Sequence, residues 1–222
     1  MLCFGDSNTW GYRPGKGDRW PESVRWPGVL RVELGSTWRV VEAGLNGRTT
    51  VFEDPLGDKC GRRHVGPVLE SAAPVDVVIV MLGVNDLKTR FGASAYEIAE
   101  GAGTVVDAVR GSPFGPEGRA PHVILVAPPP LTTLQGWEER DPEAFAGFDT
   151  MWLDGQRKSR EFGRQYARVA QVRGVGFLDA ATHVTTSDID GVHWSAEGHA
   201  AFGRAAAAAL REKRFGQGPP GP

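Results

Sequence analysis

Five short apolar runs, rich in β-branched residues, recur along this chain with helical patterns between the later ones. Such runs are typical of strands whose two faces are both buried. Strands that alternate with helices along a chain usually pair in parallel, because each helix crosses back over the sheet. The runs span residues 1–4, 39–42, 75–82, 122–127 and 175–178. The pattern predicts an α/β chain with helices on both faces of a five-stranded parallel sheet.

Apolar residues at helical spacing supply the stripes that would cover this sheet. Ser195 stands before the last stripe and is predicted to cap its helix. At 222 residues the chain is long enough for one well-packed domain and short for two. We expect a domain over 1–214 and, because Gly and Pro dominate 215–222, a disordered tail there. The stripes lie within 98–109, 162–170 and 202–210.

Charge and cysteine content restrict the partners and the compartment. With 25 basic and 27 acidic residues the net charge is −2, so nothing favours nucleic acid or an anionic membrane as a partner. A small neutral substrate fits better. Cys3 and Cys60 are too few for a disulfide scaffold or a four-cysteine zinc site. No signal-peptide pattern and no apolar run near the ~20 residues of a membrane helix occur, so we expect a soluble cytoplasmic protein.

Two irregular stretches, 111–121 and 128–150, are rich in Gly, Pro and charged residues. The second is long for an α/β domain and carries large apolar side chains such as Leu131 and Trp137. We predict that it covers the active site or a subunit contact. The G-x-G-x-x-G pattern of the tail lacks a preceding strand and a following helix, so no nucleotide cofactor is expected.

Polar and glycine-rich clusters follow four of the predicted strands. Ligands of parallel sheets bind beyond the carboxyl ends of the strands, where neighbouring connections diverge. The clusters therefore meet at the edge where a site would form. They are residues 5–9, 42–47, 83–86 and 188–193.

These clusters contain every group that acyl transfer requires. Ser7 can attack a carbonyl carbon, His193 can accept its proton, and Asp190 can hold the imidazole. The backbone N–H groups of Ser7 and Gly44 and the side-chain amide of Asn85 can donate to the oxyanion. No G-x-S-x-G elbow surrounds Ser7, which excludes the α/β-hydrolase pattern and favours a smaller fold.

Alternatives exist for the acid and for the base. Asp188 would share a face with Asp190 in an extended segment, so spacing alone does not separate them. Asn85 and Asp86 could instead cap a following helix. The competing histidines lie at the wrong edge of the sheet or lack an aspartate three residues earlier, and they form no zinc-ligand pattern with Asp190, so no metal is expected. They are His64, His122, His183 and His199.

Aromatic residues flank the clusters and can line an apolar pocket for the acyl or alcohol group. Trp10 and Tyr12 follow Ser7 closely, and Trp194 follows His193. These three are the predicted substrate-binding residues. Any one of them could instead be ordinary core.

With Ser7, Gly44, Asn85, Asp190 and His193 in this order along the chain, the sequence resembles the SGNH (GDSL) hydrolases. The family's four blocks correspond to Gly5-Asp6-Ser7, to Gly44, to Gly83–Asp86 and to Asp190–His193, and Asn8 replaces the family's leucine. The resemblance implies a flavodoxin-like three-layer sandwich as a single domain. It also favours Asp190 over Asp188.

A closer resemblance is to the aryl-esterase and acyltransferase branch. It rests on Gly-Asp-Ser-x-Thr-x-Gly at 5–11, Val-Arg-Trp at 24–26 and Pro-Pro-Pro-Leu at 128–131. It implies short acyl esters as substrates and a homo-oligomer. The leading hypothesis is a serine esterase acting on aryl, alkyl or acetylated-sugar esters; the alternatives are an acyltransferase to an alcohol and, from another class, a non-catalytic flavodoxin-like binding module.

Overall fold

The five predicted runs form one sheet in which each neighbouring pair of strands is parallel. The strand order is β2-β1-β3-β4-β5, so the chain reverses its direction across the sheet at β1. The computed structural model describes residues 1–132 and 146–212. Its strands are β1 (Leu2–Gly5), β2 (Val41–Gly44), β3 (Val77–Met81), β4 (His122–Ala127) and β5 (Gly176–Asp179). The predicted five-stranded parallel sheet is therefore confirmed.

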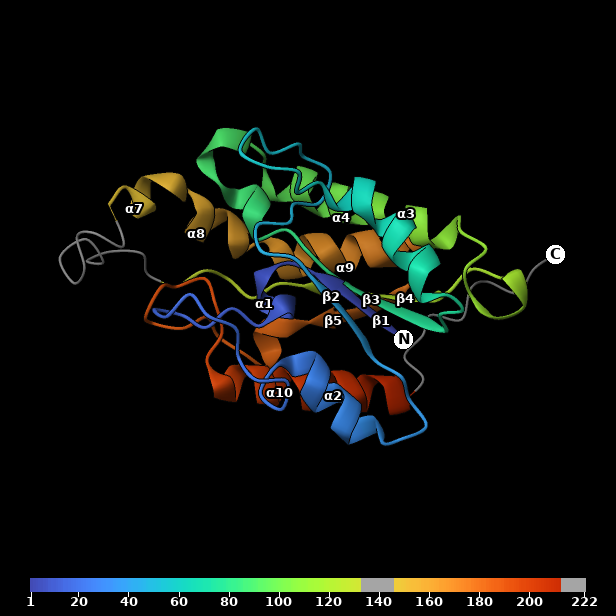
Figure 1. Ribbon diagram of the computed structural model, residues 1–222. Helices are drawn as coiled ribbons and strands as arrows, with labels where there is room; N and C mark the ends of the chain where they lie inside the picture. The colour runs from blue at the N-terminus through green and yellow to red at the C-terminus, as the bar shows by residue number, and fades with distance from the viewer. Residues whose placement is uncertain (133–145, 213–222) are drawn as a thin grey trace.

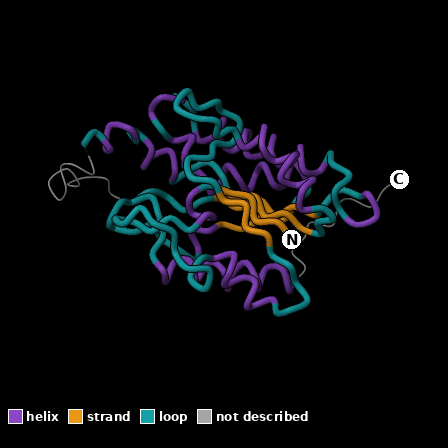
Figure 2. The backbone as a smooth tube through the Cα atoms, in the orientation of Figure 1, coloured by secondary structure: helices purple, strands orange, loops and turns teal. Residues whose placement is uncertain are grey.

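Helices cover both faces of this sheet (Figure 1). On one face lie α2 and α10, and on the other lie α3, α4 and α9, so the strands form the middle of three layers (Figure 2). The helices are α1 (Ser7–Trp10), α2 (Trp26–Leu34), α3 (Gly61–Ala72), α4 (Ala95–Arg110), α7 (Phe148–Met151), α8 (Gly155–Ser159), α9 (Phe162–Arg173) and α10 (Ala196–Arg211). Short 3-10 turns span Asn85–Leu87, Thr89–Phe91, Pro116–Gly118 and Ala180–Thr182.

The alternation of side chains along each strand divides the core into two clusters. Leu2 and Phe4 of β1 are buried with the apolar stripes of α3, α4 and α9. Cys3 points the other way and is buried with α2 and α10. There Trp26 and Phe202 pack edge to face, with their ring centroids 5.2 Å apart. The sheet is thus apolar on both faces, as the unbroken apolar runs predicted.

Local hydrogen bonds set the starts of the two longest described helices. Ser94 and Glu97 form a capping box at the start of α4. Ser195 accepts a hydrogen bond from the N–H of Gly198 at the start of α10, which confirms the predicted cap. These caps anchor helices whose apolar stripes then pack on the sheet.

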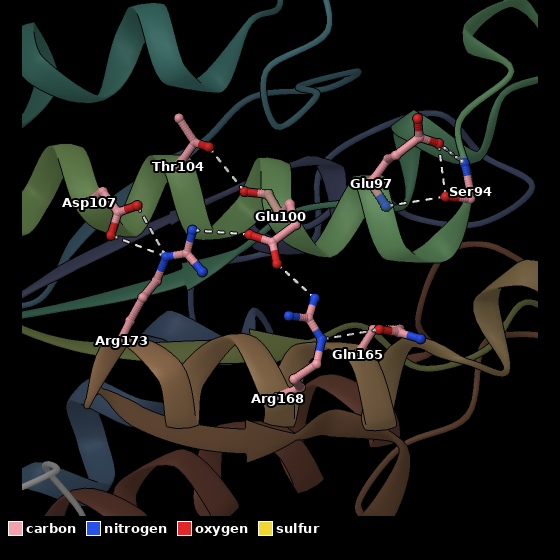
Figure 3. Close-up of polar contacts among 8 residues, drawn as sticks. All are labelled: Ser94, Glu97, Glu100, Thr104, Asp107, Gln165, Arg168 and Arg173. Atoms are coloured by element: carbon pink, nitrogen blue, oxygen red, sulfur yellow. Dashed lines mark hydrogen bonds and ion pairs between the residues drawn. The ribbon is translucent and has the colours of Figure 1, made fainter.

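Charged side chains join α4 to α9 on the outer surface (Figure 3). Arg168 donates to Glu100 at 2.7 Å, and Arg173 donates to Glu100 and to Asp107, both at 3.1 Å. Each of the four side chains has an opposite charge as its partner. We call this network of Glu100, Asp107, Arg168 and Arg173 the α4–α9 seam.

The sequence predicted the positions of the strands better than their ends. The expected runs 1–4 and 39–42 stop at or near their last apolar side chain. In the structure, β1 and β2 continue to Gly5 and Gly44, which pair with each other. Strand β4 begins and ends where it was expected to. Glycines at strand ends pair like any other residue but add no apolar signal to the sequence.

Most of the loop over 128–150 and the tail over 215–222 lie outside the described residues. The predictions for those two segments therefore stay predictions. Across the described ranges 1–132 and 146–212, no helix combines the length and apolar character needed to cross a bilayer.

Candidate functional site

Ser7 lies directly beyond the end of β1, as the first residue of α1. Asp6 caps this short helix by accepting the N–H of Asn8 at 2.9 Å. The turn is tight: a Cβ on Gly5 would lie 2.0 Å from Oγ1 of Thr9. Only a glycine allows the chain to turn from strand to helix this sharply. The Ser7 side chain is therefore held at the switch point of the sheet, with only 5% of the residue exposed.

His193 and Asp190 continue a chain of hydrogen bonds from Ser7. Nε2 of His193 lies 3.0 Å from Oγ of Ser7, and Nδ1 lies 2.7 Å from Oδ2 of Asp190. The other carboxylate oxygen of Asp190 accepts the backbone N–H groups of Val192 and His193, at 3.0 and 2.9 Å. Nδ1–H therefore points at the carboxylate, which leaves Nε2 to face Ser7 as the acceptor.

The electrostatics of Asp190 agree with this geometry. Burial by itself would raise the pKa of Asp190, but the hydrogen bond and charge of His193 and the two backbone donors hold it below its ordinary value. Asp190 is thus an ionised partner for the imidazole. The structure distinguishes the two candidate aspartates by their contacts. Asp190 is hydrogen-bonded to His193, whereas Asp188 lines a neighbouring cavity.

Of the predicted aromatic residues, two lie near the Ser7–His193 pair and one does not. Tyr12 stacks on the His193 ring, with the ring centroids 4.1 Å apart. Trp10 is half-buried and lies 6.5 Å from Tyr12, centroid to centroid. Trp194 is fully buried and packs on Phe202 in the core beside α10. The prediction that Trp194 lines a substrate pocket is corrected, because its ring points into the core and not toward the site.

Asn85 begins the 3-10 turn after β3 and is 6% exposed. One hydrogen of its side-chain amide goes to the carbonyl of Arg48 at 3.1 Å. The amide has two hydrogens, and the second has no acceptor among the described residues, so it can donate to a ligand. Asp86 does not cap a helix; it accepts the N–H and the hydroxyl of Thr50.

The orientation of β2 bears on the predicted donor Gly44. Val41 and Leu45 donate their N–H groups to β1, to the carbonyls of Met1 and Gly5. N–H groups alternate in direction along a strand, so the N–H of Gly44 points away from β1. The lack of a side chain at Gly44 serves packing instead, since a Cβ would lie 2.1 Å from the backbone nitrogen of Trp10.

Gly47 offers a backbone N–H group that the sequence analysis did not consider. It has a φ of +81°, in the left-handed region, in the turn that Arg48 closes by donating its N–H to Leu45 at 3.1 Å. Within the described part of the chain, the N–H groups of Gly47 and Ser7 have no protein acceptor. The signal that could have identified Gly47 is a second glycine in the polar cluster after β2.

Three buried charges surround this turn. Burial raises the pKa of Asp6 to about 6, against the opposing effects of the Asn8 N–H, His193 and Arg48. Burial also raises the pKa of Asp86 to about 7, although Thr50 donates to it. Burial lowers the pKa of Arg48 to about 10, with Asp6 opposing. Clusters of perturbed groups are typical of active sites.

The competing histidines do not join the site as bases. His199 is fully buried, its Nδ1 accepts the N–H of Trp26 at 3.3 Å, and burial lowers its pKa to about 3. His64, on α3, lies 3.1 Å from the carboxylate of Asp58, which precedes that helix. No group of potential metal ligands occurs in the part of the chain that the structure describes.

A cavity of about 550 Å³ is lined by residues that precede and follow the Asp190–His193 segment, but neither Ser7 nor His193 is among its lining residues. Its lining combines hydroxyl, charged and aromatic side chains, which suits a polar molecule with an apolar face. The lining includes Arg13, Lys16, Trp20, Ser187–Ile189 and Ser195–Glu197.

Comparisons with known proteins agree with the fold. The model of the GDSL-like lipase/acylhydrolase family matches residues 3–201. A carbohydrate acetylesterase from Sinorhizobium meliloti is 38% identical, with 95% of this chain and 97% of that chain covered and a TM-score of 0.87. The aryl esterase of M. smegmatis is 35% identical over 95% and 97% of the two chains, with a TM-score of 0.86.

A member of the lipolytic G-D-S-L family from Veillonella parvula shares the fold at 16% identity, with 95% of each chain covered and a TM-score of 0.59. No curated protein sequence matched the chain.

Proposed function

The chain belongs to the GDSL-like lipase/acylhydrolase family and is a carboxylic-ester hydrolase, and from that premise we propose that it cleaves short-chain acyl esters through an acyl-serine intermediate on Ser7. The observation that carries the proposal is the unbroken chain of hydrogen bonds from Ser7 through His193 to Asp190, at 3.0 and 2.7 Å. This is the arrangement that a serine nucleophile and its base require.

Acylation begins when Oγ of Ser7 attacks the carbonyl carbon of the ester and passes its proton to Nε2 of His193. Asp190 stabilises the imidazolium that forms, through the Nδ1 hydrogen bond. The tetrahedral intermediate then breaks its bond to the alcohol oxygen. His193 returns the proton to that oxygen, and the acyl group stays on Ser7.

Charge on the carbonyl oxygen needs donors during this step. The free N–H of Ser7 and the second amide hydrogen of Asn85 are two donors at this edge of the sheet. We assign Gly47 as the third donor in place of Gly44, because no described residue accepts its N–H, whereas the N–H of Gly44 points away from β1. Each such donor lowers the barrier by about 3 kcal/mol in comparable sites.

Deacylation repeats these steps with water. His193 takes a proton from the water that attacks the acyl carbon, and the proton goes to Oγ of Ser7 as the acid leaves. Aryl, alkyl and acetylated-sugar esters are the proposed substrates. Their support is the two similar proteins, which are named as a carbohydrate acetylesterase and an aryl esterase.

The test is loss of the nucleophile. Ser7→Ala is expected to lower kcat/KM for p-nitrophenyl acetate by roughly 10⁴-fold or more. A fluorophosphonate should label the wild-type chain once, at Ser7, and leave Ser7→Ala unlabelled. Ser36→Ala, the same substitution at an exposed serine outside the site, serves as a matched control, with the phosphonate label retained. Substantial ester cleavage by folded Ser7→Ala would refute the proposal.

Transfer of the acyl group to an alcohol is a second outcome of the same intermediate. The observation that favours it is the aromatic surface of Tyr12 and Trp10 beside His193, which the alkyl group of an alcohol can contact and water cannot use. Product analysis in water that contains a primary alcohol measures the partition. Free acid as the sole product would remove the transferase proposal and leave the esterase proposal intact. The reading as a non-catalytic binding module is set aside, because the chain is a carboxylic-ester hydrolase.

A further inference from the structure

We propose that Arg48 is a positioning residue that holds the oxyanion donors of this site in register. The inference rests on the proposed function and goes beyond it, because Arg48 itself touches no reacting atom. It acts on three strand ends, and each of these precedes or carries one of the donors.

The side chain of Arg48 ties β1 to β2 at their carboxyl ends. Its Nη1 donates to the carbonyl of Gly5 at 2.7 Å and to the carbonyl of Ala43 at 2.5 Å. Gly5 lies two residues before Ser7. Ala43 leads into the turn that carries Gly47. One nitrogen therefore fixes the spacing between two segments whose N–H groups must converge on a single oxygen atom.

The backbone of Arg48 connects the third donor. Its carbonyl accepts the side-chain amide of Asn85 at 3.1 Å, and its N–H closes the turn from Leu45. Any residue at this position has that carbonyl. What arginine adds is the side-chain anchor that keeps the carbonyl aimed at Asn85.

Burying an arginine at this position lowers the stability of the fold. It is 5% exposed, its guanidinium lies 4.2 Å from the centre of the Phe4 ring, and its Nε has no hydrogen-bond partner within the described residues. Its hydrogen bonds go to neutral carbonyls, and no carboxylate forms an ion pair with it in the described ranges; the charge of Asp6 only partly opposes the effect of burial on the pKa of Arg48. A buried charge without a bonded counter-charge destabilises a fold relative to an apolar side chain. Its presence is therefore better explained by function than by stability.

The experiment compares Arg48→Lys and Arg48→Met with wild type, in steady-state cleavage of p-nitrophenyl acetate. Active-site concentration is titrated to completion with a fluorophosphonate, and folding is checked by thermal unfolding. Lysine keeps one charged terminal nitrogen, so kcat should fall by about tenfold. For methionine the fall should be about 10²-fold, near the effect of losing an oxyanion donor. KM should change by less than about threefold, because the ground-state ester needs no oxyanion donor.

A double-mutant cycle with Asn85→Ala separates positioning from general destabilisation. If Arg48 acts through the donors, Arg48→Lys should lower kcat much less in the Asn85→Ala background than in wild type. Arg173→Met is the matched control: it removes another arginine that is largely buried, in the α4–α9 seam, and should leave kcat unchanged.

Two results would overturn the inference: kcat of Arg48→Lys within about twofold of wild type, or the same fold-loss in both backgrounds. If Arg48→Met does not fold, Arg48→Lys alone decides. Failure here is distinct from failure of the proposed function. Inactive Ser7→Ala with fully active Arg48 variants refutes only the positioning role, whereas active Ser7→Ala refutes the proposed function.

Discussion

The edge of the sheet around Ser7 and the seam between α4 and α9 differ in whether their polar and charged groups have bonding partners. In the seam every charge is paired: Glu100 and Asp107 hold Arg168 and Arg173 (Figure 3). At the sheet edge, polar atoms are buried without a hydrogen-bond partner in the described residues. They are Oδ2 of Asp6, Oδ1 of Asn8, Oγ1 of Thr9, Oδ1 of Asn46 and Nε of Arg48.

The difference indicates that the sheet edge around Ser7 lowers the stability of the fold, whereas the seam does not. Unpaired buried polar groups cost about 1–3 kcal/mol each, whereas a half-exposed ion pair stabilises by less than about 1 kcal/mol. The seam joins two helices and requires no strain. The sheet edge leaves polar groups buried and unpaired, and it holds donors and a nucleophile that are fixed before substrate arrives. Substitutions in the two regions should therefore separate activity from stability.

The largest expected effect is on activity at the sheet edge. Asp190→Asn keeps the shape of the side chain but removes the charge that stabilises the His193 imidazolium. We expect kcat to fall by roughly 10⁴-fold at neutral pH, with little change in the unfolding temperature. Asp188→Asn is the matched control and should retain activity. Comparable losses in both variants would contradict the assignment of Asp190.

The next effect is on the pH dependence of stability. Asp86 has an ordinary pKa of 3.8 and, when buried in the fold, a pKa of about 7. The folded chain thus binds the proton more tightly, so the free energy of unfolding falls as pH rises from about 4 toward 7. Asp86→Asn can still accept from Thr50 and should remove a slope of up to about 1.4 kcal/mol per pH unit. Denaturant titrations at several pH values measure it; an unchanged slope would contradict the buried-acid interpretation.

A smaller effect on activity is expected at Tyr12. Its ring stacks on His193 at 4.1 Å and limits the freedom of the imidazole. Tyr12→Ala should lower kcat by about tenfold, in line with the ~1 kcal/mol of an aromatic pair. Tyr12→Phe keeps the stack and should stay within about twofold of wild type. A large loss in Tyr12→Phe would show that the hydroxyl, not the ring, matters.

The smallest effect is expected in the α4–α9 seam. The hydrogen bond from Arg168 holds the pKa of Glu100 below its ordinary value of 4.5. Glu100 therefore stabilises the fold above that pH, and this contribution disappears as pH falls through its folded pKa, opposite in sign to Asp86. Glu100→Gln should destabilise by less than about 1 kcal/mol at pH 7, less so in high salt, with kcat unchanged. A fall in kcat would break the separation between the two regions.

Features that repeat along the chain were predictable from sequence. The apolar runs located all five strands, and the polar clusters after them located Ser7, Asn85 and the Asp190–His193 segment at one edge. Because parallel strands end on the same side of the sheet, locating the strands in the sequence also predicts that the polar clusters after them meet at one edge.

Features set by direction and packing were not predictable. The register of β2 decides that the N–H of Gly44 points away from β1, and no pattern in the sequence encodes that direction. Trp194 follows His193, yet its ring is buried against Phe202 because α10 packs there. No sequence pattern around Arg48 indicates its hydrogen bonds to the carbonyls of Gly5 and Ala43. The expected homo-oligomer and the cytoplasmic location stay predictions.

The most direct test of the account is whether different esters pass through one acyl-enzyme. The wild-type chain is given p-nitrophenyl acetate or phenyl acetate in water with a fixed concentration of methanol, and the ratio of methyl acetate to acetic acid is measured. A common acetyl-Ser7 intermediate predicts the same ratio for both esters, because the leaving group has departed before the acceptor is chosen. A ratio that changes with the leaving group, with methyl acetate formed from at least one ester, would contradict the acyl-serine mechanism.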